Sequence, residues 1–248
     1  GEDGLELELS MGKALSFDGV EDANVNLGTA YTNLSGAKTI EFWCKPEAPN
    51  TTNMFFGVQN VANPTGMRFY CDDDNNSGKL RLYSSVSGVM KITTNNVFSY
   101  GVSQHIALVD SGSKVKVYKN GQFIEELNIT MDFSVLTGTK EFTIVQGYHS
   151  NGVRGYKGTI DEFRIWNTTR TQQQIQDNMN KELTGNEIGL IGYWKFNEGE
   201  GSVAYDSTEN ENDGTISGAT WVGGIVEAYL EQGTRTSPSL DLSPVGTA

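Results

Sequence analysis

The feature that most constrains the fold is a series of short segments in which apolar and polar residues alternate. In Thr39–Lys45 the even-numbered residues are apolar, and in Lys79–Tyr83 two leucines alternate with Lys, Arg and Tyr. A period of two residues is typical of a β-strand that buries one face. Similar runs occur at Leu15–Phe17, Val25–Leu27, Ile106–Val109, Val115–Tyr118, Phe142–Val145 and Ile160–Trp166. The series predicts an all-β protein.

Turn signals separate these runs. The clearest is Asn120-Gly121, which lies between Lys114–Lys119 and Gln122–Glu126. Asn-Gly accepts positive φ at both central positions of a type I′ turn, so this segment predicts a β-hairpin. Regularly spaced strands with almost no helix between them predict a two-sheet antiparallel jelly-roll sandwich.

One segment has a helical pattern instead. Within Thr171–Leu183, Ile175, Met179 and Leu183 are four residues apart and would form one apolar stripe. Thr171 and Gln174 have the spacing of a capping box, and Gly185 suits the end of the helix. We expect one short helix in the C-terminal half, packed on the sandwich.

The runs also indicate the domain organisation. We expect one β-sandwich domain over residues 1–232, with its core over about residues 10–222. Residues 233–248 are rich in Ser, Thr and Pro and resemble a linker-like tail. Cys44 and Cys71 could form a disulfide if their strands are neighbours, or could be two buried thiols.

The charge of the chain excludes some partners. The sequence has 18 Lys+Arg and 31 Asp+Glu, and 18 − 31 gives a net charge of −13. Such a charge repels phosphate, so we expect neither nucleic acid nor an anionic membrane surface as a partner. No stretch approaches the roughly 18 apolar residues of a membrane span, so we expect no membrane insertion.

Several stretches resemble one family in order along the chain. They are Ala14–Gly19, Thr39–Pro46, Gln104–Val109, Val115–Gly121, Gly158–Trp166 and Gly189–Gly214. The chain resembles the laminin G-like, pentraxin-related branch of the concanavalin A-like lectin/glucanase superfamily, in its bacterial form. The resemblance implies a two-sheet antiparallel jelly roll. The aromatic residue that the family pattern often carries just before the Gln104–Val109 strand is missing, because Val102 and Ser103 stand there.

A calcium ion is one expectation. Asp161 shares the parity of Phe163 and Ile165, which we place on the core side, where a carboxylate is costly unless it is bound. Asp18 ends a strand next to Gly19, whose carbonyl could coordinate. The resemblance implies a structural calcium where the first and last core strands meet, held by Asp18, Gly19 and Asp161. The alternative is that Asp161 caps a turn and Asp18 binds backbone amides.

A sugar-binding rim is a second expectation. The Gly147–Gly155 stretch and its flank are rich in aromatic and hydrogen-bonding groups. Aromatic faces stack on the C–H groups of pyranose rings. We expect the ligand-binding residues to be Tyr148, His149, Asn151, Arg154 and Tyr156. The alternative is an ordinary solvated loop with Tyr156 packed on the core.

Catalysis is not expected. The ExDxxE run of related glucanases is missing, Glu41 is the one carboxylate within a core-like strand, and His105 suits a structural role. The sequence therefore predicts a non-catalytic, lectin-like module that binds a glycan or polysaccharide. Such a module would belong to a secreted, cell-surface or periplasmic protein. The alternatives are an adhesion or protein-interaction module and, less favoured, a glycoside hydrolase.

Overall fold

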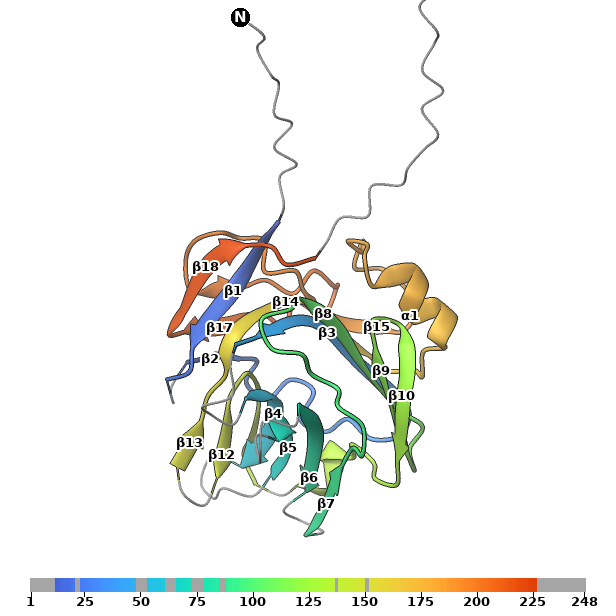
Figure 1. Ribbon diagram of the computed structural model, residues 1–248. Coiled ribbons are helices and arrows are strands. Elements are labelled where there is room, and N and C mark those ends of the chain that lie inside the picture. The colour runs from blue at the N-terminus through green and yellow to red at the C-terminus, as the bar shows by residue number, and fades with distance from the viewer. Residues whose placement is uncertain are drawn as a thin grey trace, which may run out of the picture.

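The computed structural model describes residues 12–20, 23–47, 53–60, 66–72, 78–84, 88–136, 138–149 and 152–226. The predicted tail, residues 233–248, lies outside the described residues. Within the described ranges the chain forms two antiparallel sheets of eight strands each and one hairpin (Figure 1). The predicted all-β, two-sheet sandwich with a short helix is confirmed.

The first sheet, which we call sheet A, has the strand order β10-β9-β8-β3-β14-β1-β18, and β15 also pairs with β14. Its strands are β1 (Lys13–Asp18), β3 (Lys38–Pro46), β8 (Gln104–Asp110), β9 (Val115–Lys119), β10 (Gln122–Leu127), β14 (Lys157–Trp166), β15 (Leu190–Trp194) and β18 (Ala219–Gly223). The first and last described strands, β1 and β18, are therefore neighbours.

The second sheet, which we call sheet B, has the order β16-β17-β2-β11-β4-β5-β6-β7. Its strands are β2 (Asn24–Asn26), β4 (Met54–Asn60), β5 (Gly66–Asp72), β6 (Lys79–Ser84), β7 (Val89–Ile92), β11 (Lys140–Ile144), β16 (Val203–Ala204) and β17 (Gly214–Ser217). The hairpin of β12 (Gly147–His149) and β13 (Gly152–Arg154) contacts β4.

The core lies between the two sheets and is built largely from Phe residues. Phe56 of β4 stacks on Phe69 and Phe142 within sheet B, with ring centroids 4.1 and 5.8 Å apart. Its ring edge meets Phe42 of β3 and Phe163 of β14 in sheet A. The even positions of Thr39–Lys45, which the sequence pattern assigned to one face, point into this core. Cys44 and Cys71 are buried in different sheets and are not joined by a disulfide.

The outer face of sheet A is covered by α1 (Gln172–Asn178) and the segment that follows it (Figure 1). Ile175 of α1 packs on Ala107, Val109 and Tyr118. A second cluster contains Trp166, Leu183, Leu190 and Tyr193. Sheet A is therefore covered on both faces, which explains why nearly every residue of β3, β8 and β14 is buried.

Two local predictions can be compared with the structure. The hairpin at Asn120-Gly121 is confirmed, with φ of 49° and 69° at the two turn residues. The capping box of Thr171 and Gln174 is also confirmed. The helix, however, ends at Asn178 and not near Leu183, because side chains from sheet A bind the carbonyl groups at its C-terminal end. No helix in the described ranges is long and apolar enough to cross a membrane.

The short 3₁₀ helix η1 (Phe133–Val135) contributes Phe133 to the core. Among the described residues no helix lies over the outer face of sheet B. The two faces of the sandwich therefore differ. One is closed by α1, and the other presents strand side chains.

Candidate functional site

A cluster of buried charges lies under α1 on the outer side of sheet A. Arg164 of β14 donates to the carbonyls of Asn178 and Lys181 at 3.0 and 2.6 Å, and to the Glu162 carboxylate at 2.5 Å. Trp43 of β3 donates its Nε1–H to the carbonyl of Met179. These donors satisfy carbonyls that a helix leaves free at its C-terminal end. The cluster thus fastens α1 to the sheet.

Glu41 and His105 belong to the same buried cluster. The Oε1 of Glu41 accepts the Nε1–H of Trp166 at 2.9 Å, and its Oε2 lies 3.7 Å from Nε2 of His105. Burial raises the pKa of Glu41, with Arg164 and Arg170 opposing the rise. Burial and the same two guanidinium groups lower the pKa of His105, so the imidazole is neutral near pH 7. Both side chains are shielded from solvent, which supports a structural role.

The sequence pattern predicted that Asp161 lies on the core side of its strand, and this prediction is wrong. The register pairs Asp161 with Trp43 and Arg164 with Glu41, so β14 holds one extra residue between these two pairs. Glu162 is part of this bulge and has a φ of 50°. Direct partners share a face, which places Asp161 on the outer side with Trp43. Its Oδ2 accepts the amide of Ile225 at 3.0 Å.

The three residues expected to hold calcium do not lie together. Asp18 pairs with Lys157, so Asp161 is 161 − 157 = 4 positions further along β14, about 13 Å away. The exposed Asp18 accepts the amide of Val20. The backbone of Gly155 packs closely against the carbonyl oxygen of Gly19, because a Cβ built at Gly155 would lie only 3.0 Å from that oxygen. The described residues also contain no group of three His, Cys, Asp or Glu arranged to hold a metal. Asp18, Gly19 and Asp161 therefore do not fit one shared ion.

Calcium binding elsewhere on the protein stays a prediction. It is tested by comparing melting midpoints in EDTA and in millimolar calcium. Because Asp161 is far from Asp18 and binds a backbone amide, Asp161→Asn should leave any response to calcium unchanged. Loss of a calcium-dependent shift in that variant would contradict the placement of Asp161.

Asp161 should also make stability depend on pH. Burial raises its pKa from 3.8 to about 8, and the amide of Ile225 opposes the rise. The folded protein then holds a proton that the unfolded chain releases between pH 4 and 8. Stability should fall as pH rises through this window, by at most about 1.4 kcal/mol per pH unit from this group. In Asp161→Asn this contribution should vanish, which urea unfolding at pH 5, 6.5 and 8 would measure. An equal slope in both proteins would contradict it.

The predicted sugar-binding rim lies at the hairpin beside β4. Tyr148 and His149 belong to β12 and Arg154 to β13, whereas Asn151 lies outside the described residues. Tyr156 is fully buried, with its ring against Phe17 and Phe55. Its hydroxyl donates to the carbonyl of Thr159 at 3.0 Å. Tyr156 is therefore a core residue here and presents no face to a ligand.

The outer face of sheet B carries a group of side chains that the sequence prediction missed. Arg68 and Tyr70 of β5 pair in register with Tyr83 and Arg81 of β6, respectively. The guanidinium of Arg68 lies over the ring of Tyr83 at 5.3 Å, and that of Arg81 lies over the ring of Tyr70 at 5.4 Å. We call these four residues the Tyr–Arg face. Both tyrosines and Arg81 are half-buried, while Arg68 is nearly covered.

The rest of this face has a regular layout. Gly57 of β4 is the register partner of Arg68, so it brings no side chain beside the guanidinium. Met90 and Ile92 of β7 pair with Tyr83 and Arg81 on the other side, and Met90 is 46% exposed. The alternation in Lys79–Tyr83 already indicated that Arg81 and Tyr83 lie on the same, outward face of one strand. Its partners on β5 could not be found without the strand register.

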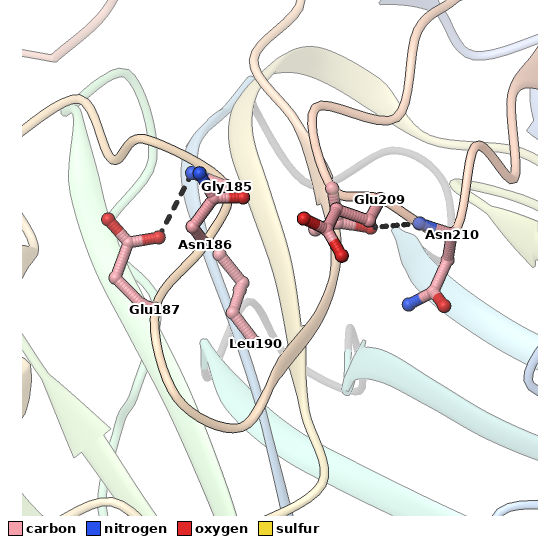
Figure 2. A pocket seen from close by; sticks show the side chains of 7 residues that line it. Gly185, Asn186, Glu187, Leu190, Glu209 and Asn210 are labelled. Carbon is pink, nitrogen blue, oxygen red and sulfur yellow. Dashed lines mark hydrogen bonds between the residues drawn. The ribbon is translucent and has the colours of Figure 1, made fainter.

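A separate pocket of about 210 Å³ lies between two loops after α1 (Figure 2). It is lined by Gly185, Asn186, Glu187, Leu190, Thr208, Glu209 and Asn210. The Glu187 carboxylate accepts the amides of Thr184 and Gly185, and Asn210 donates to the carbonyl of Ile191. Most of its polar groups thus hold the loops together, and no aromatic ring lines it.

Comparison with known proteins places this geometry in a family. The family model described as concanavalin A-like lectin/glucanases superfamily matches residues 18–176. No curated protein sequence matches the chain. A Bacteroides ovatus ATCC 8483 protein proposed to bind carbohydrate is similar, with 23% identity and a TM-score of 0.67. The match covers 87% of this chain and 61% of that protein, so the chain spans about three fifths of it.

Two further solved structures share the fold. The heptameric SAP-like pentraxin of Limulus polyphemus has 15% identity and a TM-score of 0.55, over 88% of this chain and 97% of that one. The Ruminococcus gnavus IT-sialidase CBM40 bound to α2,3-sialyllactose has 16% identity and a TM-score of 0.52, over 68% and 98%. The family match covers more than half of the sequence, and the neighbours have the same sandwich. The chain belongs to the laminin G-like family of the concanavalin A-like lectin/glucanase superfamily.

Proposed function

We propose that this protein binds carbohydrate without cleaving it, on the Tyr–Arg face of sheet B. The observation that carries the proposal is the group of two half-buried tyrosines and two arginines on the side of the sandwich that α1 leaves open. Solved structures with this fold include a sialidase module bound to sialyllactose. That likeness agrees with the proposal, and the argument rests on the residues.

The chemistry of the face suits a sugar. A tyrosine ring offers a flat apolar surface to pyranose C–H groups, and its hydroxyl can hydrogen-bond. Arginine N–H groups donate to sugar oxygens. Tyr70 and Tyr83 are held on paired strands and packed against guanidinium groups, so little conformational entropy is lost when a ligand binds.

The β12–β13 hairpin would form one border of this site. It contacts β4, which is the next strand to β5 in sheet B. We retain Tyr148, His149, Asn151 and Arg154 as rim residues in the proposal. A secreted or cell-surface location would give such a module access to glycans, and we propose it together with the function.

Three carboxylates in the strands, Glu141, Glu41 and Glu162, are poorly placed for hydrolysis on this face. A retaining glycosidase needs two carboxyl groups about 5 Å apart across the substrate, and an inverting one needs roughly 6.5–9.5 Å. Glu141 lies two strands from β5 and accepts a hydrogen bond from Asn26. Glu41 and Glu162 are buried beneath α1 on the other sheet. None of these is placed to form a catalytic pair on the Tyr–Arg face.

A glycan array followed by calorimetry tests the proposal. The wild-type protein should bind at least one saccharide, and Tyr70→Ala combined with Tyr83→Ala should weaken binding about tenfold or more, because two stacking faces are lost. Tyr205→Ala is the matched control. Tyr205 is 58% exposed and follows β16, at the opposite edge of sheet B. An equal loss in the control, or no loss in the double variant, would contradict the site.

The same samples separate binding from hydrolysis. Incubation of the bound saccharide with the protein should release no reducing sugar above the buffer blank. Sustained release would favour the hydrolase alternative.

A protein-interaction module is the second candidate. Ile188 is 98% exposed on the loop that walls the pocket of Figure 2, and a partner that covered this side chain would gain its buried apolar area. This function predicts a blank glycan array and a protein partner whose capture is lost in Ile188→Ser.

A further inference from the structure

His105 of β8 is buried under the end of α1, on the outer side of sheet A. It is 1% exposed, and its register partner Trp43 meets the imidazole edge-on, with ring centroids 5.7 Å apart. In the part of the chain that the structure describes, neither ring nitrogen forms a hydrogen bond with a protein group. The Oε2 of Glu41, 3.7 Å from Nε2, also lacks a donor there. A proton added to this imidazole would create a buried charge that no hydrogen bond satisfies.

The end of α1 closes this site from the outside. On one side of His105, the indole of Trp43 donates to the carbonyl of Met179. On the other side, Asn120 accepts the amide of His105, and a Cβ built at the adjacent Gly121 would lie only 3.4 Å from the sulfur of Met179. Met179 therefore contacts residues on both sides of the imidazole. Because α1 has only 7 residues, it is too short to be stable alone and depends on such contacts.

The charges around His105 balance while the imidazole is neutral. The guanidinium groups of Arg164 and Arg170 lie among the carboxylates of Glu41 and Glu162. A proton on His105 would leave one positive charge in excess, and a proton on Glu41 would increase that excess. Burial and the two guanidinium groups accordingly lower the pKa of His105.

The other titratable groups around this site do not offer an anion to a charged imidazole. Tyr118 of β9 and Tyr193 of β15 stay neutral below pH 7, because burial raises the pKa of both phenols. The remaining charged groups on the surrounding elements are exposed or bonded elsewhere: Asp161 to the amide of Ile225, Lys119 to Ser99, Asp177 of α1 to Gln173, and Lys181, which is exposed.

We propose that protonation of His105 releases α1 from sheet A, so that this contact is a pH-sensitive switch. The sandwich core lies behind the sheet, so water can reach the imidazole only where the end of α1 is displaced. Once α1 is released, His105 takes up a proton near its ordinary pKa of about 6.5, whereas the buried imidazole does so only at lower pH. Docking of α1 is therefore complete above about pH 6.5 and weakens as pH falls below it. Release would expose Ala107, Val109 and Tyr118, which Ile175 now covers.

Hydrogen exchange of the folded protein tests this switch. The amides of Ile175 and Met179 donate within α1, and those of Leu27 and Phe142 donate within sheet B. From pH 7 to pH 5, the protection factors of the α1 amides, corrected for intrinsic exchange, should fall about tenfold or more. The protection factors of the sheet B amides should change by less than about threefold.

Variants at the two histidines of the chain make the readout specific. In His105→Gln the α1 protection factors should agree within about twofold at pH 7 and pH 5, whatever their level, because the titrating group is gone. Glu41 and Asp161 are present in both proteins, so their titration cancels in this comparison. His149→Gln is the matched control, since His149 belongs to β12 outside sheet A, and it should keep the full effect.

Three results would overturn the switch. An equal loss of protection in α1 and in sheet B at pH 5 would mean that acid unfolds the whole domain. A tenfold effect that survives in His105→Gln would assign the pH dependence to another group. If His105→Gln does not fold, an imidazole of His105 that titrates near pH 6.5 in the folded wild-type protein, followed by NMR, would contradict the proposal. Carbohydrate binding is tested separately, on the opposite sheet.

Discussion

Arg164→Met is expected to lower the free energy of unfolding by about 3–5 kcal/mol, the usual cost of removing one partner from a buried ion pair. Arg164 is 1% exposed and donates to Glu162, to the carbonyl of Asn178 at the end of α1 and to the carbonyl of Lys181 just beyond it. Without it, the carboxylate of Glu162 keeps the hydroxyl of Tyr193 as a donor but loses its positive partner. The carbonyls of Asn178 and Lys181 lose their donor as well. Urea unfolding monitored by tryptophan fluorescence would measure the change.

The matched control for Arg164 is a solvent-exposed pair. Lys157 and Glu47 lie 3.4 Å apart, and their side chains are 47% and 55% exposed. Lys157→Met should therefore cost less than about 1 kcal/mol. The double variant Arg164→Met/Glu162→Gln should be less destabilised than the sum of its single changes, because they act on one pair. A loss below 1 kcal/mol in Arg164→Met would contradict the fastening role of the cluster.

Phe56→Ala is expected to cost about 3–5 kcal/mol as well, because a buried phenylalanine leaves a cavity that the surrounding core cannot fill. Phe56 contacts aromatic rings of both sheets. Its truncation therefore weakens the packing of sheet A on sheet B as well as the packing of its own strand. Thermal and urea unfolding should show the loss without a change in the far-ultraviolet spectrum of the native state.

Phe123→Ala serves as the control for ring truncation. Phe123 is 49% exposed on β10, with its ring edge against Tyr118. Its truncation should cost less than about 1 kcal/mol, since little buried area is lost. Similar losses in the two variants would mean that the aromatic core between the sheets is not the main source of stability.

Much of the fold was predictable from the sequence because its signals are local. The alternation in Thr39–Lys45 identifies the residues that face the core, and Asn120-Gly121 identifies a hairpin by its tolerance of positive φ. Thr171 and Gln174 identify the start of the helix. Its end was not predictable, since Arg164 and Trp43 reach it from distant strands.

The candidate site could not be predicted from the sequence, because it depends on a bulge in β14 and on the register between β5 and β6. One extra residue at Glu162 reverses the parity of β14, so a simple alternation assigned Asp161 to the wrong face. The Tyr–Arg face requires the register between β5 and β6, which joins Arg68 to Tyr83 and Tyr70 to Arg81. Neither residue pair is visible from spacing alone. Tyr156 was expected at the rim because it is aromatic, but it fills the core.

The central claim is that a saccharide binds on the outer face of sheet B. A titration of ¹⁵N-labelled protein with the best array glycan, followed by amide chemical shifts, tests it most directly. The account predicts that the largest shifts fall on β5, β6 and β7 around Tyr70, Arg81 and Tyr83, with α1 unaffected. Shifts centred on the loops of residues 185–190 and 207–210 would place the site in the other pocket and contradict the account.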